Sequence, residues 1–337
     1  MKLSLKPLLW ATALTLSSQA LAANPIPNNL TELSTYAKVS QESLALAIQD
    51  AVYQQKIIDS ITKPSEGKPW WQYRKIFITV SRIEAALKFY FENEKELLRA
   101  QKEYGVPYEI ILAIMGVETF YGKNMGSWRV LDALYTLGFN YPKRSAYFSK
   151  EFARFVALKE RENWDYNNIT GSYAGAMGMG QFMPSAYLDY AVDFDNDGHV
   201  DLFTNKSDAI GSIANYFKGH GWQTGHGIYY PAHVHNADIQ SLMDKGWNLT
   251  VDELYQAGVT TKVNLSKNQQ IRLFKYELED GSFGYSVGLN NFKTIMRYNT
   301  SQLYARAVYE LSEFIAINVN KIKAKRGQKV TPRSRQP

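Results

Sequence analysis

The strongest constraint on this chain is an acidic loop at residues 193–208, DFDNDGHVDLFTNKSD. Its first half places Asp193, Asp195 and Asp197 at alternate positions and follows them with a glycine. A calcium loop has this spacing, because it takes side-chain oxygens at positions 1, 3 and 5, a turn glycine at 6 and a backbone carbonyl at 7. Carboxylates crowded in this way repel one another unless a cation lies between them. The sequence therefore predicts a structural site for Ca²⁺, or alternatively Na⁺, with the carbonyl of His199 as a further ligand.

The second half of the loop departs from a regulatory EF-hand. Position 12 is Thr204, where an EF-hand has a bidentate glutamate. Asp208, four residues later, can close a longer loop as the last ligand. Asp201, at position 9, either binds through a water or does not bind. The alternative to a metal site is a solvated acidic turn, which the regular spacing disfavours.

A glycine-rich segment, GSYAGAMGMGQFMPSAY at residues 171–187, precedes the acidic loop. So many glycines disfavour a free-standing helix, since each costs about 1 kcal/mol relative to alanine. They do allow the backbone to approach a ligand or another helix closely. Tight packing in a core explains Gly175 and Gly178 equally well. It explains the polar Gln181 poorly, so this segment is a candidate part of a binding site.

Residues 107–122, PYEIILAIMGVETFYG, are predicted to form a helix that begins at a proline and ends near a glycine. Its apolar stripe contains Ile111, Ile114 and Met115, and the next position on that face is Glu118. Burial against apolar neighbours raises the pKa of a carboxyl group, which a general acid needs near neutral pH. The alternative is an ordinary glutamate that caps a loop or pairs with an arginine.

Taken together, the ordered motifs resemble a known family. They are GVETFYG, NYPKRSAYF, GSYAGAMGMGQFMPSAY, the acidic loop, DAIGSIANYFKGHGW and RYNTSQLYARAV. In this order they resemble membrane-bound lytic transglycosylase B and its soluble relatives, glycoside hydrolase family 103. The resemblance runs from about residue 27 to about residue 318.

The resemblance implies a peptidoglycan lytic transglycosylase. Such enzymes cut the β-1,4 bond between N-acetylmuramic acid and N-acetylglucosamine and leave a 1,6-anhydromuramoyl end, without adding water. Glu118 matches the catalytic glutamate, which protonates the glycosidic oxygen and then takes the proton of the C6 hydroxyl. Three alternatives remain: a lysozyme-type muramidase, a non-catalytic peptidoglycan-binding protein and a calcium-dependent adhesion module.

Further residues match the family's cleft. Ser172 corresponds to a serine that hydrogen-bonds near the catalytic carboxylate and the substrate's acetamido group. The other implied substrate-binding residues are Gln181, Tyr216, Tyr298, Asn299 and Tyr304, together with the basic pair Lys143 and Arg144. The implied metal ligands are Asp193, Asp195, Asp197, the His199 carbonyl and Asp208. For each tyrosine the alternative is ordinary core packing, because buried tyrosines are common.

The N-terminus has the pattern of a secretory signal peptide at residues 1–22. Lys2 and Lys6 precede an apolar run, and Ala20-Leu21-Ala22 forms a cleavage site. The chain has no cysteine, so it cannot carry a lipid-modified N-terminal cysteine. We therefore expect a periplasmic protein that is soluble rather than lipid-anchored, with no integral membrane segment in the mature chain. Its expected partners are peptidoglycan glycan strands and possible cell-wall synthesis or hydrolysis proteins, and not nucleic acid.

The expected fold class is α+β and mainly helical, with a lysozyme-like core. Residues 23–100 should form an N-terminal helical domain and residues 101–218 the catalytic core with the EF-hand-like loop. Glycines and β-branched residues at 219–291 indicate a small inserted β domain. Residues 292–320 should form a core-closing helix. The last segment, 321–337, has seven basic residues and no acidic one, which indicates a basic disordered tail.

Overall fold

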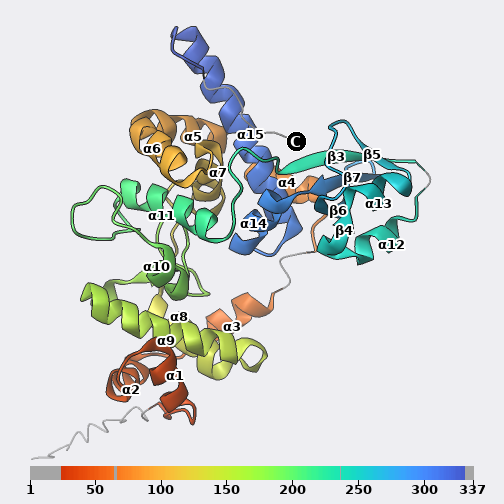
Figure 1. Cartoon of the computed structure of the whole chain (residues 1–337). Helices are drawn as coiled ribbons and strands as arrows, with labels where there is room; N and C mark the ends of the chain where they lie inside the picture. The colour runs from red at the N-terminus through yellow and green to blue at the C-terminus, as the bar shows by residue number, and fades with distance from the viewer. Residues whose placement is uncertain (1–23, 64–66, 236, 331–337) are drawn as a thin grey trace, which may run out of the picture.

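The computed structural model describes residues 24–63, 67–235 and 237–330, and Figure 1 shows how their helices and strands are arranged. The predicted signal peptide and residues 331–337 of the predicted tail lie outside the described residues. Within the described ranges, no helix is both long enough and apolar enough to cross a membrane. Helices predominate and a five-stranded sheet accompanies them, so the predicted α+β, mainly helical class is confirmed.

The α-helices, in chain order, are α1 (Leu30–Ala37), α2 (Gln41–Asp50), α3 (Gln55–Thr62), α4 (Trp70–Phe77), α5 (Val80–Glu92), α6 (Glu94–Tyr104), α7 (Tyr108–Thr119), α8 (Val130–Asn140), α9 (Ser145–Glu162), α10 (Pro184–Tyr190), α11 (Lys206–Gly219), α12 (Ile239–Asp244), α13 (Val251–Gln256), α14 (Asn290–Tyr298) and α15 (Gln302–Lys325). The strands are β1 (Trp128–Arg129), β2 (Thr170–Gly171), β3 (Tyr229–Val234), β4 (Leu249–Thr250), β5 (Val259–Thr261), β6 (Gln270–Glu277) and β7 (Phe283–Gly288). Short 3-10 segments are η1 (Pro142–Arg144), η2 (Tyr166–Asn168) and η3 (Gly246–Asn248).

Helix α7 lies at the centre of the molecule and is buried on every side. From Tyr108 to Val117 its residues are apolar except for Glu109, and all of them are buried. Helices α5, α6, α11 and α15 contact it. A helix that is hydrophobic all round is stable only inside a core. The predicted helix is therefore confirmed, and its buried surface is wider than a single apolar stripe.

The chain leaves α7 through a left-handed turn. Phe120, Tyr121 and Gly122 have φ values of 52°, 61° and 85°, so the helix ends at Thr119 and not near Gly122 as predicted. The N–H of Tyr121 donates to the carbonyl of Met115 at 3.0 Å, which satisfies one of the free carbonyls at the helix end. A left-handed residue other than glycine costs about 1–2 kcal/mol, so the surrounding contacts must hold this turn in place.

The N-terminal helices do not form one unit. α1 and α2 pack on α9, and α3 packs on α8, whereas α4 and α5 pack on α15 and α6 packs on α11. Figure 1 shows α1 and α2 at one end of the molecule and α5 and α6 towards the other. The predicted N-terminal domain, residues 23–100, is thus divided between two parts of the structure. Amphipathic spacing shows that a helix needs a partner, but it does not identify that partner.

The five-stranded sheet lies within the residues predicted as a β domain, and all its strand pairs are antiparallel in the order β4-β6-β7-β3-β5. On β6, Ile271 and Leu273 belong to a small core of their own that contains residues of α12 and α13. Phe274 and Tyr276 belong instead to the main core. Successive strand residues point to opposite faces, so the sheet is buried on both sides.

Two helices close the core where a single helix was predicted for residues 292–320. Asn299 separates them, because its Oδ1 accepts the N–H of Ser301 at 3.0 Å, and Ser301 then caps α15. α15 continues to Lys325, into the residues predicted as a disordered tail. The reason is the buried Lys323, whose Nζ lies 2.5 Å from Glu94 Oε1 on α6. The cluster of basic residues did not reveal that one of them, Lys323, is buried and has an acidic partner.

A chain of three hydrogen-bonded residues connects the end of α7 to the acidic loop. Thr119 Oγ1 donates to the carbonyl of Met179 at 2.8 Å and accepts the N–H of Gly122 at 2.9 Å. The N–H of Met179 donates to the carbonyl of Leu202 at 2.8 Å. We call this the Thr119–Met179–Leu202 relay. It fixes the left-handed turn against the glycine-rich segment and the acidic loop.

We expect Thr119→Val to lower the free energy of unfolding by about 2–3 kcal/mol, because valine keeps the shape but leaves two backbone groups without a partner. Urea denaturation followed by circular dichroism measures the change. Thr260→Val, at an exposed strand position, is the matched control and should stay within about 0.5 kcal/mol of the wild type. Equal effects of the two substitutions would remove the relay from this account.

Candidate active site

Glu118 lies in the last turn of α7, and its carboxyl group meets the first turn of α15. Tyr304 Oη donates a hydrogen bond to Glu118 Oε1 at 2.5 Å. Burial raises the pKa of Glu118 to about 7, although the hydrogen bond from Tyr304 acts in the opposite direction. A carboxyl group in this environment is partly protonated near neutral pH, so it can both donate and accept a proton.

Tyr298 and Tyr304 keep their protons in this site. Burial, reinforced by the nearby charge of Glu118, raises the pKa of both phenols well above the ordinary value. Tyr298 Oη donates to the carbonyl of Gly180 at 2.7 Å, whereas Tyr304 donates to Glu118 itself. Tyr304 is therefore hydrogen-bonded to the candidate acid, whereas Tyr298 is near that acid and hydrogen-bonded to the glycine-rich segment.

Tyr216 extends this aromatic group away from Glu118. Its ring centroid lies 4.8 Å from that of Tyr298 and 4.0 Å from that of His220, on which it is stacked. Its hydroxyl donates to the carbonyl of Arg297 at 2.8 Å. Sequence reasoning missed His220, although its spacing of four residues from Tyr216 on a predicted helix was a usable signal.

The glycine-rich segment folds into a compact loop beside β1. Gly171 pairs with Trp128, and Met177 bridges to both Gly171 and Phe182. Gly178 has a φ of 69°, and a Cβ added there would meet the carbonyl oxygen of Leu202 at 2.6 Å. Tight packing, the alternative considered for these glycines, therefore accounts for Gly178.

Ser172 and Gln181 hold the ends of that loop. Ser172 Oγ accepts the N–H groups of Ala174 and Ala176 at 3.3 and 3.1 Å. Gln181 has a φ of 52°, and its Nε2 donates to the carbonyls of Met125 and Gly178 at 3.0 and 3.1 Å. Among the described residues, no hydrogen bond joins either side chain to Glu118, so their substrate-binding roles stay predictions.

The remaining predicted cleft residues are exposed. Lys143 and Arg144 lie in η1, and the Arg144 guanidinium carbon is 4.8 Å from the ring centroid of Tyr147. The side-chain oxygen of Asn299 accepts a hydrogen bond from the N–H of Ser301 in the turn before α15. In the described part of the chain, no hydrogen bond or ion pair joins these three residues to Glu118. Their roles towards a substrate stay predictions.

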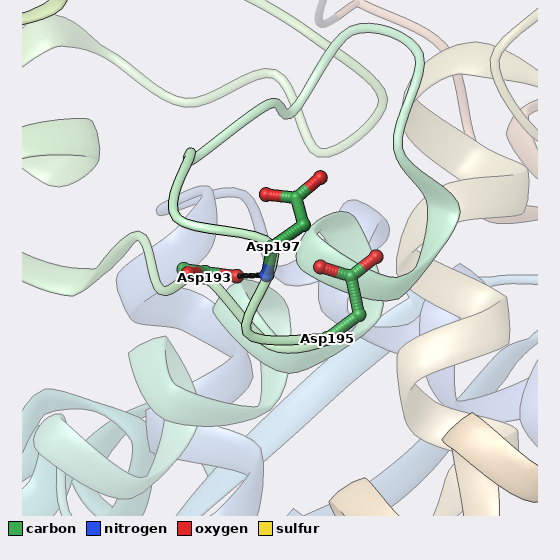
Figure 2. Close-up of side chains that lie close together, drawn as sticks. All are labelled: Asp193, Asp195 and Asp197. Atoms are coloured by element: carbon green, nitrogen blue, oxygen red, sulfur yellow. Dashed lines mark hydrogen bonds between the residues drawn. The ribbon is translucent and has the colours of Figure 1, made fainter.

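The acidic loop brings its first three aspartates together, as Figure 2 shows. One carboxylate oxygen from each of Asp193, Asp195 and Asp197 lies within 4.8 Å of the others. Backbone N–H groups orient them: Asp193 accepts from Asp197 and Gly198 at 3.0 and 2.8 Å. Three hard oxygen donors at this separation fit a hard cation such as Ca²⁺.

Asp208 is fully buried beneath the loop. Its Oδ1 accepts the N–H of Phe194 at 2.7 Å, and its Oδ2 accepts the N–H of Asp201 at 2.8 Å. Each oxygen keeps a lone pair, so a ligand role is compatible with these bonds. The side chain of Asp201 accepts the N–H groups of Phe203 and Thr204 and so shapes the turn. The ligand roles of Asp208 and of the His199 carbonyl stay predictions.

Comparison with known proteins identifies similar chains over most of this sequence. A family model described as the transglycosylase SLT domain matches residues 23–313. Membrane-bound lytic murein transglycosylase B of Escherichia coli (strain K12) is 42% identical over 284 residues, which cover 80% of this chain and 78% of that protein.

Solved structures agree with this match. The structure of catenated lytic transglycosylase SltB1 from Pseudomonas aeruginosa is 43% identical with a TM-score of 0.80, and the match covers 86% of this chain and 96% of that chain. The structure of the Escherichia coli lytic transglycosylase Slt35 in complex with calcium is 39% identical with a TM-score of 0.76, over 86% of this chain and 92% of that chain. The resemblance found in the sequence motifs is thereby confirmed, and the chain belongs to the SLT-domain family of lytic transglycosylases.

Proposed function

We propose that this protein is a peptidoglycan lytic transglycosylase that cleaves the β-1,4 bond between N-acetylmuramic acid and N-acetylglucosamine and leaves a 1,6-anhydromuramoyl end. The observation that carries the proposal is the pairing of Glu118 with Tyr304, in which a half-buried carboxyl group with a pKa of about 7 is held by a neutral phenol. Family membership supplies the substrate class, since the relatives are named murein transglycosylases.

The reaction needs a single carboxyl group that acts twice. Protonated Glu118 gives its proton to the glycosidic oxygen as the bond to C1 breaks. The resulting carboxylate then takes the proton of the C6 hydroxyl while that oxygen forms a bond to C1. No water is consumed, and Glu118 ends the cycle protonated again. Tyr304 orients the carboxyl group through Oε1 and stabilises its charged form between the two steps.

A lysozyme-type muramidase is the nearest alternative. Most glycoside hydrolases place a second carboxylate about 5–10 Å from the acid. Within the described ranges, the side chain hydrogen-bonded to Glu118 is the Tyr304 phenol, and no hydrogen bond joins Glu118 to another carboxyl group. This favours the single-acid reaction. A non-catalytic binding protein or an adhesion module would need no carboxyl group with such a shifted pKa.

Other groups are proposed to hold the glycan strand beside Glu118. Ser172 has its Oγ fixed by two backbone N–H groups, which leaves its O–H to donate to an acetamido oxygen. The rings of Tyr216 and Tyr298 offer apolar faces for sugars, while their hydroxyls are engaged by the protein. The proposed polar contacts at the ends of the cleft come from Gln181, Asn299, Lys143 and Arg144.

The acidic loop is proposed to hold a structural Ca²⁺, with Na⁺ as the alternative. Asp193, Asp195, Asp197, the His199 carbonyl and Asp208 would hold it, and a bound cation would neutralise the gathered carboxylates. Support comes from the relative whose structure was solved in complex with calcium. Through the relay, the loop supports the turn that follows Glu118.

The cellular setting is proposed from the sequence. An N-terminal signal peptide would deliver the chain to the periplasm, where its substrate lies. Glycan strands are its proposed ligand, and proteins of cell-wall synthesis or hydrolysis are its proposed partners.

Glu118→Gln should lower kcat by several orders of magnitude and leave glycan binding intact, because glutamine keeps the shape of the side chain but cannot donate the proton. Mass spectrometry of digested peptidoglycan measures the products. The wild type should release anhydromuramoyl ends. Hydrated reducing ends, heavier by one water, would instead identify a muramidase, and retained turnover by the variant would rule out Glu118 as the acid.

The kcat/KM of the wild type should be constant below pH about 7 and fall about tenfold per pH unit above it, because the free enzyme must hold Glu118 protonated. Initial rates on a soluble glycan fragment give this profile. A profile without a decline above that pKa would contradict the assignment.

Stability gives an independent check on the same group. Its pKa is raised from 4.5 to about 7 by folding, so its contribution is fully present below pH about 4.5 and is lost as the pH rises through about 7. Glu118→Gln never ionises. It should match the wild type in unfolding free energy near pH about 4 and exceed it by up to about 3 kcal/mol above pH about 8.

Calcium should raise the melting temperature of the wild type but not of the double variant Asp195→Ala, Asp197→Ala. Saturating ligand at about a hundred times its Kd adds about 2.7 kcal/mol to the folded state. Differential scanning calorimetry after chelation measures this shift. The double variant Glu32→Ala, Glu42→Ala removes two exposed acids elsewhere and should keep the full response. An equal calcium response in both double variants would contradict the site, and exchange of Na⁺ for K⁺ tests the sodium alternative.

A further inference from the structure

An open pocket of about 440 Å³ lies beside the turn that follows the catalytic glutamate. Helix α5 lines it through residues that include Phe89, and the left-handed turn lines it through Phe120 and Tyr121. Lys206, the first residue of α11, also lines it. None of the substrate-binding residues proposed above lines this pocket.

Two lining residues of the pocket closely follow the proposed acid in the sequence. Phe120 follows Glu118 by two residues, so their Cα atoms are at most about 7 Å apart. A peptide of three to five residues spans about 10–17 Å when extended. A peptide attached to the sugar at Glu118 is therefore long enough to enter the pocket.

Aromatic rings give the pocket an apolar surface. The ring centroids of Phe89 and Tyr121 are 5.7 Å apart, and those of Phe120 and Tyr121 are 6.1 Å apart. These rings come from two separate elements, α5 and the turn after α7, and both are held in the main core. Such a surface suits short aliphatic side chains.

Charged groups around the pocket are only partly paired with one another. Glu92 has two lysines nearby, with Lys206 Nζ at 3.5 Å and Lys88 Nζ at 3.8 Å. Lys123 lies with its Nζ 5.1 Å from the ring centroid of Phe120, and within the described ranges it forms no ion pair. Glu84 likewise forms no ion pair with a described residue. The pocket thus presents one unpaired ammonium group and one unpaired carboxylate.

We propose that this pocket binds the peptide stem of a peptidoglycan strand, with Lys123 pairing a stem carboxylate and Glu84 pairing a stem amino group. The inference rests on the proposed function, because the stem is joined to the muramoyl sugar whose bond is cleaved. A stem with a diamino acid carries carboxylates, a free amine and small aliphatic side chains, which match the three kinds of group in the pocket. After the stem is removed, the muramoyl sugar keeps a lactyl carboxylate but carries no amine and no aliphatic side chain, so it offers no partner for Glu84.

The test measures binding in the Glu118→Gln background, so that it is independent of turnover. Two ligands are compared by calorimetry: a short glycan strand with its stems, and the same strand after an amidase has removed them. We expect the stem-bearing strand to bind about tenfold more tightly, and Lys123→Gln to lower that ratio to about threefold, because one charge-assisted contact is lost while the contact with Glu84 remains. Lys262→Gln, which changes an exposed lysine of the sheet region, should keep the ratio.

The proposed contact between Glu84 and the stem amine is tested by changing either partner. Acetylation of the stem amine should weaken binding several-fold, by about the same factor as Glu84→Gln, and the two changes together should be no worse than either one.

Three results would overturn the proposal. They are equal Kd values for both strands, an unchanged ratio in Lys123→Gln, and additive effects of Glu84→Gln and acetylation. Loss of anhydromuramoyl products in the wild type would count against the proposed function alone, since these binding measurements do not depend on turnover.

Discussion

The burial of α7 on all sides is the constraint on which the rest of the structure depends. A helix without a solvent face must be enclosed by others, and α5, α6, α11 and α15 provide that enclosure. Its only acidic group near the C-terminal end, Glu118, emerges where the enclosure stops. The same packing that stabilises the fold therefore raises the pKa of the carboxyl group. Core formation and the raised pKa of Glu118 are two results of one arrangement.

Holding a carboxyl group in this place carries a free-energy cost, and so does the left-handed turn behind it. The relay from Thr119 to Leu202 offsets part of that cost with buried hydrogen bonds. Because the relay ends in the acidic loop, the proposed cation site and the proposed active site share one set of contacts. The acidic loop looks peripheral in Figure 1, but two hydrogen bonds connect it to the turn after Glu118.

Short-range features were predictable, and long-range partners were not. The spacing of Asp193, Asp195 and Asp197 brings them together within one loop, so sequence alone predicted that cluster. Helical periodicity likewise placed Glu118 beside a core. The family resemblance placed both Glu118 and Tyr304 in the cleft, but it did not predict their hydrogen bond, which spans 186 residues. Nothing in the local pattern showed that residues 23–100 would divide between two parts of the fold, or that a lysine in a basic tail would be buried.

Strand β6 places alternate side chains in two different cores, Leu273 in one and Phe274 in the other. The region between α11 and α14 therefore cannot be exchanged as a separate domain, because strand β6 contributes side chains to the main core. If the sheet were removed, an aromatic face of the catalytic core would be left open to water. A shortened relative would have to replace Phe274 and Tyr276 before it could lose the strands that carry them. Insertions at the tips of the sheet avoid this difficulty, so new surfaces can arise there while α7 stays enclosed.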